Sequence, residues 1–149
     1  MESVEAVEKI LNYSFTNKSL LKEAISNGSI ESTPKFQRLE FLGDSVLEVA
    51  ITNHIHLTAP NIRTRELRKL RHANVRNEIF ARAAVRNNLY QYTIRDTHDL
   101  QQTEQVKVFS EAVREENGPV LDHGLVKAPK VLAELVESIA GAVYYRCEF

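Results

Sequence analysis

Four acidic residues lie in two segments that are otherwise almost entirely apolar. Glu40 and Asp44 occur in the segment LEFLGDSVL, and Glu134 and Glu137 occur in the segment VLAELVESIAGAV. Residues three or four positions apart lie on one face of a helix, so each segment presents a pair of carboxylates. Like charges repel, and burial of an unpaired charge costs free energy. The two pairs therefore predict one shared site that requires a cation.

A hard divalent cation would neutralise such a site. Mg²⁺ prefers oxygen ligands and keeps water molecules for a phosphate substrate, and Mn²⁺ is the substitute that we expect. A bound divalent cation lowers the pKa of water and stabilises charge on a leaving oxygen, which is the chemistry of phosphodiester hydrolysis. On spacing alone, solvated helix faces or ordinary ion pairs are the more common explanation of such carboxylates.

Helices are the elements that would position these carboxylates. Only five glycines and four prolines occur in 149 residues, and no segment shows the alternation of a half-buried strand. We therefore predict an all-α fold, with a loop over residues 28–35, and we expect the helix that contains Glu40 and Asp44 to be buried on most sides. The expected helices cover about residues 4–12, 17–25, 36–57, 62–73, 77–88, 103–116 and 129–146.

A single domain over residues 1–149 accounts for the chain, since its length is typical of one domain and no repeat or linker interrupts it. The one cysteine, Cys147, has no partner for an internal disulfide. No segment has the length and apolarity of a membrane span, and the acidic N-terminus lacks the apolar run of a signal peptide. We expect a soluble intracellular protein whose chain carries no targeting segment, does not engage a membrane and does not indicate its compartment.

Two long segments resemble the characteristic motifs of the ribonuclease III family. The first is Gln37–Leu47 (QRLEFLGDSVL), and the second is Lys130–Tyr144 (KVLAELVESIAGAVY). Shorter stretches are similar to weaker motifs of the family, namely Tyr13–Leu21 (YSFTNKSLL), Leu67–Arg71 (LRKLR) and Val75–Glu78 (VRNE). The resemblance covers essentially the whole chain in order. The residues within the motifs are most similar to those of plant ribonuclease III-like and Dicer-like members.

The resemblance implies both a site and an assembly. By position, the four metal-site carboxylates of the family fall on Glu40, Asp44, Glu134 and Glu137, with Asp44 and Glu137 the most critical for catalysis. The implied fold is a helical homodimer whose two active sites lie along a valley that holds an RNA duplex. Each site would cut one strand with Mg²⁺ and leave short 3′ overhangs. Phe41 would lie in the dimer interface, although a core aromatic explains this residue equally well.

Three positions depart from the family pattern. The family usually has Asp at the position of Glu134, and the extra methylene of Glu moves the carboxylate outward, which Mg²⁺ tolerates badly. Glu is frequent at the position of Gln37, and histidine is usual at the position of Asn27. No carboxylate of the expected site is lost, but these changes are compatible with a weakened enzyme.

A basic stretch over residues 63–76 is opposed only by Glu66. The net charge of the chain is -1, so binding to RNA requires a local basic face. Arg65, Lys69 and Arg76 recur at helical spacing, and an isolated run of this kind is usually a solvated helix face. Beside a nuclease motif, we expect these three residues to contact the backbone of duplex RNA, which proteins recognise by shape.

Three functions remain open at this point. The first is an active endoribonuclease specific for double-stranded RNA, which the four retained carboxylates favour. The second is a degenerate ribonuclease III fold that binds RNA or a partner without cleaving, for example in an organellar ribosome. Glu134 and the absence of a double-stranded-RNA-binding domain within this chain favour the second slightly. The third, a helical interaction module, leaves the carboxylates in their apolar segments unexplained.

Overall fold

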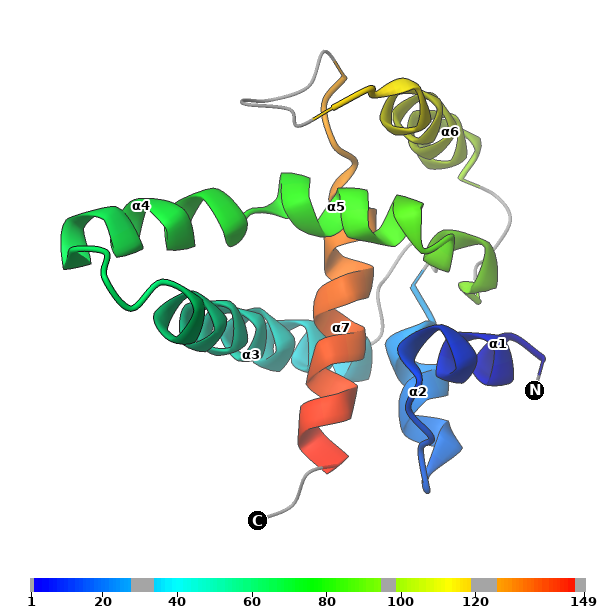
Figure 1. Cartoon of the computed structure of the whole chain (residues 1–149). Helices are drawn as coiled ribbons and strands as arrows, with labels where there is room; N and C mark the ends of the chain where they lie inside the picture. The colour runs from blue at the N-terminus through cyan, green and yellow to red at the C-terminus, as the bar shows by residue number, and fades with distance from the viewer. Residues whose placement is uncertain (1, 28–33, 95–98, 119–125, 147–149) are drawn as a thin grey trace.

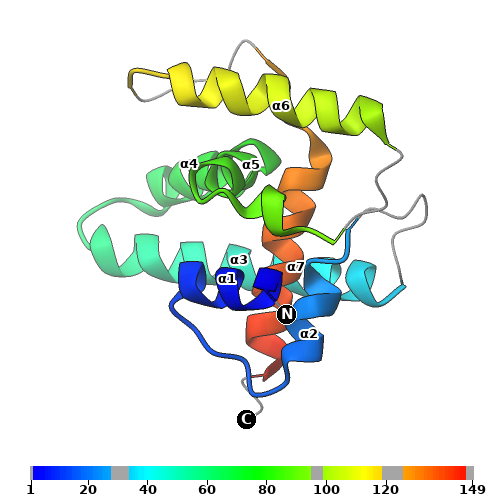
Figure 2. The same ribbon diagram turned by 90° about the vertical axis from the view of Figure 1, so that its right-hand side faces the viewer.

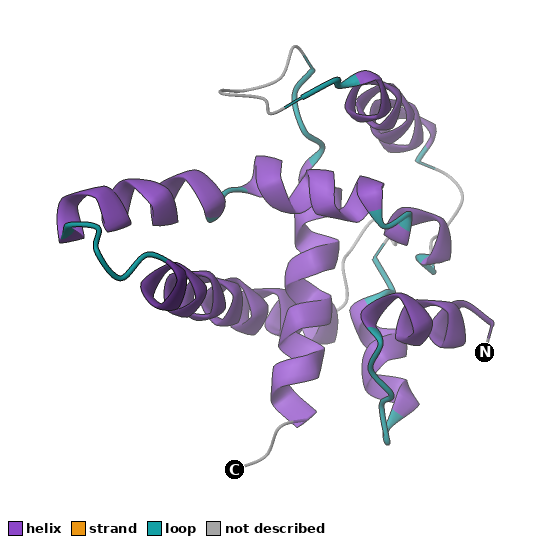
Figure 3. Cartoon of the chain, in the orientation of Figure 1, coloured by secondary structure: helices purple, strands orange, loops and turns teal. Residues whose placement is uncertain are grey.

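The computed structural model describes residues 2–27, 34–94, 99–118 and 126–146, and within them every regular element is helical (Figures 1 and 3). This confirms the all-α class. The elements are α1 (Glu2–Leu11), α2 (Lys18–Ala24), α3 (Pro34–Thr58), α4 (Thr64–Asn74), α5 (Asn77–Arg86), the short 3-10 helix η1 (Leu89–Tyr92), α6 (Leu100–Glu115) and α7 (Lys130–Arg146). Among the described residues, no helix has both the length and the apolarity that a membrane crossing requires.

Helix α7 is the centre of the core, and it packs against α3, α5 and α2 (Figure 1). Its buried apolar side chains are Val131, Leu132, Ala133, Leu135, Ile139 and Ala142. Ser138 is also fully buried, and its hydroxyl donates a 2.6 Å hydrogen bond to the carbonyl of Ala24 at the end of α2. A buried polar group is tolerated when it is bonded in this way, so Ser138 joins α7 to α2.

Helix α6 is the outermost layer, above α5, while α3 lies on the other side of α5 (Figure 2). An ion pair joins α5 to the end of α6. The guanidinium of Arg82 is buried, pairs with Glu78 on its own helix, and donates from Nη2 to Glu116 Oε1 over 2.8 Å. The same guanidinium lies 5.8 Å from the centre of the Phe109 ring. Both the pairing and the cation–π contact compensate Arg82 for its lost hydration.

Most helix boundaries differ from the expected ones by one to three residues, and two of these differences have a local cause. Helix α3 begins at Pro34, because proline suits the first helical position, where its missing N–H is not needed. Helix α5 ends at Arg86, because Asn88 has a left-handed backbone with φ 51° and the chain then forms η1. Within the expected loops, residues 28–33 and 119–125 lie outside the described residues, as does Cys147.

The expectation that α3 is buried on most sides is wrong. Only Phe36, Leu39 and Gly43 are buried in this helix, while Phe41, Val49 and Leu57 are 81%, 68% and 68% exposed. The reason is geometric, because α7 covers one face of α3 and the second half of α3 extends with α4 away from the core (Figure 1). Helix α4 contains no buried residue. The apolar sequence of α3 thus supplies an exposed apolar face as well as a core face.

Candidate active site

The two predicted carboxylate pairs lie on the two helices that cross most closely, α3 and α7. A Cβ built on Gly43 would lie 1.7 Å from the carbonyl oxygen of Glu137, and one built on Gly141 would lie 2.1 Å from the carbonyl oxygen of Leu39. Any side chain at either glycine would collide with the opposite backbone, so glycine is required for this approach. The crossing places Glu40 and Asp44, which flank Gly43, beside Glu137.

Burial of the four carboxylates is graded from the core to the solvent. Glu137 is only 7% exposed, Glu40 and Glu134 are half-buried, and Asp44 is exposed. Burial, together with the negative charges of Asp44, Glu40 and Glu134, raises the pKa of Glu137 to about 7. Burial also raises the pKa of Glu40, with added effects from Glu134 and Asp44. The four groups therefore form one electrostatically coupled cluster.

Lys130 is a member of this cluster that the sequence interpretation missed. Its ammonium lies 2.7 Å from Glu134 Oε1, and this hydrogen bond is the main reason that the pKa of Lys130 is raised. Its charge also opposes the rise in the pKa of Glu40 and Glu137. The available signal was the spacing of Lys130 and Glu134, four residues apart on one helix, which permits such a pair.

The donor set suits a hard divalent cation, since it consists of carboxylates and the most buried one has only partial compensation. In the described part of the chain, however, no group of three acidic, histidine or cysteine side chains is arranged to hold a metal ion. One of the four carboxylates, Glu134, is engaged by Lys130 instead. The residues fit a cation in their chemistry, and their side chains would have to rearrange to bind it.

Residues 37–148 match the family model of the ribonuclease III domain. The chain belongs to the ribonuclease III family. It is 58% identical over 97% of its length to ribonuclease 3-like protein 3 and 52% identical over 100% to ribonuclease 3-like protein 2, both from Arabidopsis thaliana. It is also 41% identical over 100% to the endoribonuclease Dicer homolog 3b of rice, Oryza sativa subsp. japonica. The expected resemblance to plant members is confirmed.

The ribonuclease III fold is supported by solved structures as well. The nuclease domain of ribonuclease III from Campylobacter jejuni is 27% identical and superposes with a TM-score of 0.72, over 99% of this chain and 86% of that one. A second structure of that domain, with a TM-score of 0.71, was described for flexibility in a region involved in dimer formation. The chain spans only 14%, 38% and 9% of the three plant relatives, respectively.

The three departures from the family motifs have different places in this ribonuclease III domain. Glu134 is within the carboxylate cluster. Gln37 is exposed and lines a groove with Phe41, and its spacing of three and seven residues from Glu40 and Asp44 places it on the same face of α3 as these carboxylates. Asn27 is buried after α2, and its Nδ2 donates no hydrogen bond among the described residues. Glu134 therefore lies within the expected metal site, and Gln37 shares a face of α3 with two of its carboxylates.

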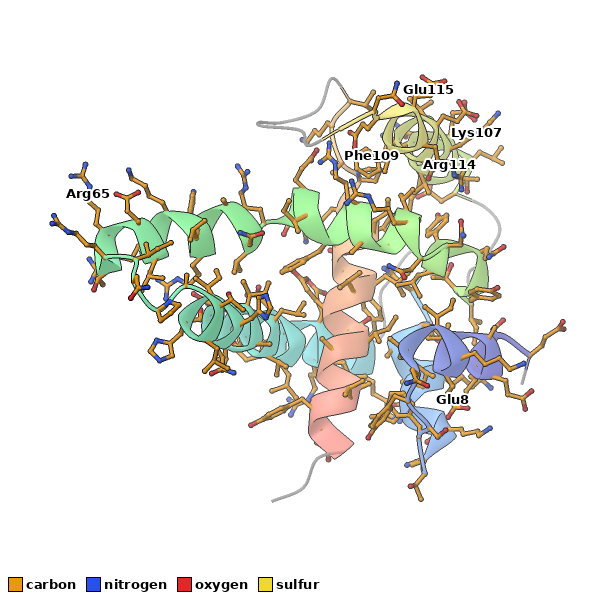
Figure 4. The ribbon with its side chains drawn as sticks, viewed as in Figure 1. Glu8, Arg65, Lys107, Phe109, Arg114 and Glu115 are labelled. Atoms are coloured by element: carbon orange, nitrogen blue, oxygen red, sulfur yellow. The ribbon has the colours of Figure 1, made fainter. Side chains whose placement is uncertain are left out.

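The predicted basic face of the domain is only partly helical. Arg65 projects from the outer end of α4 (Figure 4), and Lys69 is exposed with its Nζ 3.4 Å from Glu66 Oε2. Arg76 does not continue this face, because α4 ends at Asn74 and Arg76 has an extended backbone at the start of α5. Arg76 is half-buried, and its Nε has no hydrogen-bond partner in the described residues. The helical spacing that joined Arg76 to Arg65 is thus interrupted by a turn.

Phe41 is not a core aromatic, since 81% of its surface is exposed. It lines a groove of about 810 Å³ together with Leu20, Leu39, Leu42 and Tyr145. Exposed apolar residues gathered in one place are typical of surfaces that bind another protein. The structure therefore excludes the core explanation of Phe41.

Proposed function

We propose that this chain is the endonuclease domain of a ribonuclease that hydrolyses phosphodiester bonds of double-stranded RNA with Mg²⁺ and leaves short 3′ overhangs. The observation that supports the proposal most is the α3–α7 crossing at Gly43 and Gly141, which brings two carboxylate pairs into one coupled cluster. Structural ion pairs do not explain it, because three other carboxylates raise the pKa of Glu137 and only Lys130 opposes them.

In this proposal, Glu40, Asp44, Glu134 and Glu137 hold the divalent cation. The cation supplies activation of the attacking water and stabilisation of the leaving oxygen. Glu137 is the buried floor of the site, and Asp44 is exposed to solvent. Lys130 pairs with Glu134, and its ammonium would be available to a phosphate if Glu134 held the cation instead. Mn²⁺ is expected to substitute for Mg²⁺.

The active assembly is proposed to be a homodimer with Phe41 in its interface. The exposed apolar residues of α3 and Tyr145 of α7 supply a surface that the protomer itself does not cover. The related Campylobacter jejuni nuclease domain has a region involved in dimer formation, and that similarity supports the same arrangement here. Two copies would bring two carboxylate clusters to one duplex.

Arg65, Lys69 and Arg76 are proposed to contact the RNA backbone. Arg65 and Lys69 are exposed on α4, where Lys69 would exchange its ion pair with Glu66 for a phosphate, whereas Arg76 would have to act from its half-buried position at the start of α5. Removal of each phosphate contact should reduce the slope of log affinity against log salt concentration by about one. If the alanine variants have an unchanged affinity and salt slope, these residues are ordinary surface charges that do not contact RNA.

Cleavage of one long perfect RNA duplex tests the function. The native protein should cut it in Mg²⁺ and not in a metal-free buffer, and Glu137→Gln should abolish cutting while circular dichroism shows the same helix content. Glu111→Gln, an exposed carboxylate of α6, is the matched control and should cut normally. Undiminished cutting by Glu137→Gln would remove the proposed mechanism.

The alternative is a degenerate domain that binds RNA or a partner without cleaving. Glu134 favours it, because its longer side chain is already engaged by Lys130. Folded dimers that bind the duplex but do not cut it, both as the native protein and as Glu134→Asp, would establish this alternative.

A further inference from the structure

A groove of about 470 Å³ lies between α6 and the segment that leads into α7. Gln105 and Val108 form its wall on α6, and Val126, Lys127, Pro129 and Lys130 form the opposite wall. None of these residues except Lys130 belongs to the carboxylate cluster, and no motif of the sequence analysis singled out the other five.

The groove begins at the carboxylate cluster. Lys130 lines the groove, and its ammonium also lies 2.7 Å from Glu134 Oε1. The side chain of Lys130 is therefore shared by the groove and the carboxylate cluster. An RNA strand that extends from the carboxylates past Lys130 would therefore reach this groove.

The chemistry of the lining suits a nucleic-acid backbone. Lys127 is exposed and has no carboxylate partner among the described residues. Glu104 is the one acidic residue of the lining, and Lys127 is its lysine without a described carboxylate partner, since Lys130 pairs with Glu134. The floor is apolar, with Val108 43% exposed and Val126 half-buried. Cations above an apolar floor can hold phosphates and pack a ribose or base without reading base identity.

We propose that this groove is a subsite for the RNA strand next to the scissile bond, with Lys127 contacting a flanking phosphate. The inference rests on the proposed function and extends it, because it adds a phosphate contact outside α4, in the segment that leads into α7. Lys127 acts in binding only. Its loss is expected to weaken the association of RNA and to leave the cleavage rate of bound RNA unchanged.

The test measures binding of a short RNA duplex by fluorescence anisotropy at several KCl concentrations, with cleavage blocked by Glu137→Gln. In this background, Lys127→Ala should weaken binding about three- to tenfold and lower the salt slope by about one. Lys107→Ala is the matched control, since Lys107 is an exposed lysine of α6 that lines a different cleft and is visible in Figure 4. Lys107→Ala should change neither quantity, and Lys127→Arg should retain both.

A second measurement locates the contact. A duplex with one uncharged methylphosphonate beside the cut should bind Lys127→Ala and native Lys127 equally, because the phosphate charge that Lys127 meets is already absent. Single-turnover cleavage at saturating RNA, measured without the blocking substitution, should be the same with and without Lys127→Ala.

Two outcomes would overturn the inference, and they are distinguishable. If the native protein binds and cuts the duplex but Lys127→Ala matches Lys107→Ala in affinity and slope, the subsite is wrong and the proposed function stands. If the native protein neither binds nor cuts the duplex, both proposals fail together.

Discussion

Glu137 is only 7% exposed, yet its neighbours include three other carboxylates and one opposing ammonium. Such an arrangement lowers the stability of the metal-free protein, since a buried charge without full compensation costs free energy. Proteins keep such costs mainly where function requires them. At the scale of single residues, the charges of this domain are therefore explained better by a ligand than by the fold.

Glu134 is the residue whose identity most affects the expected chemistry. Replacement by Asp shortens the side chain by one methylene and should weaken its 2.7 Å contact with Lys130. We expect Glu134→Asp to preserve or raise the single-turnover rate of duplex cleavage in Mg²⁺, which requires strict octahedral geometry. In Mn²⁺ the native protein should improve more than the variant does.

The measurement compares cleavage rates of one duplex by both proteins in each metal, after equal helix content has been verified. A Glu134→Asp variant that is slower than the native protein in both metals would show that the longer side chain is the correct ligand here. Asp44→Asn is the control for loss of a carboxylate, and it should be inactive in either metal.

The crossing of α3 and α7 is the arrangement at the scale of elements on which the site depends. Gly43→Ala should destabilise the domain strongly, because its Cβ would meet the backbone carbonyl of Glu137 and the helices would have to separate. We expect a loss of at least about 1–3 kcal/mol in the free energy of unfolding, measured with urea, which is typical of overpacking a close contact. Cleavage should fall as well, since the two carboxylate pairs would move apart.

Gly118→Ala is the control for this prediction. A Cβ at Gly118 would meet nothing within 4 Å, so its free energy of unfolding should stay within about 1 kcal/mol of the native value. Equal stabilities of Gly43→Ala and Gly118→Ala would show that the helices tolerate greater separation than the structure indicates.

The attachment of α6 to α5 should depend on pH. The hydrogen bond from Arg82 holds the pKa of Glu116 below its ordinary value of 4.5. A carboxyl group with a lowered pKa in the folded state contributes stability above its unfolded pKa and loses it as the pH falls through the folded pKa. We therefore expect Glu116→Gln to be less stable than the native protein at neutral pH, with a difference that shrinks below the unfolded pKa and vanishes below the lower folded pKa.

Urea unfolding of both proteins at a series of pH values checks this expectation. Glu115→Gln, which removes an exposed neighbouring carboxylate, should show no such dependence relative to the native protein. A difference between native protein and Glu116→Gln that persists unchanged in acid would mean that packing, and not the charge of Glu116, accounts for it.

At the scale of the whole molecule, the outer part of α3 extends with α4 away from the core, and no other helix of the described residues packs over it (Figure 1). Phe41→Ala should therefore weaken the proposed dimer about thirtyfold or more, as loss of a central aromatic residue typically does in an interface. Light scattering at micromolar concentrations measures the oligomeric state. Leu100→Ala is the matched control, because Leu100 is 78% exposed on α6, and it should leave the dimer unchanged. A monomeric native protein would contradict the prediction.

Local patterns in the sequence predict most of the helices, because apolar periodicity and end signals act over a few residues. Asn17 caps α2, with its side chain accepting from the N–H of Ser19, which is an end signal of this local kind. The pairing of Glu40 with Asp44 and of Glu134 with Glu137 followed from helical spacing alone. The family motifs identified the domain and its four acidic positions.

Only the tertiary structure decided which faces are covered and which residues meet. The sequence of α3 has apolar residues on more than one face, so it does not reveal that α7 covers one face and leaves Phe41 exposed. The turn after Asn74 removes Arg76 from the basic face, because backbone angles at one residue redirect the side chain. The backbone contact between Gly43 and Gly141 joins residues about a hundred positions apart, and the groove beside Lys130 joins residues about twenty positions apart. Local periodicity carries no information about contacts over such separations.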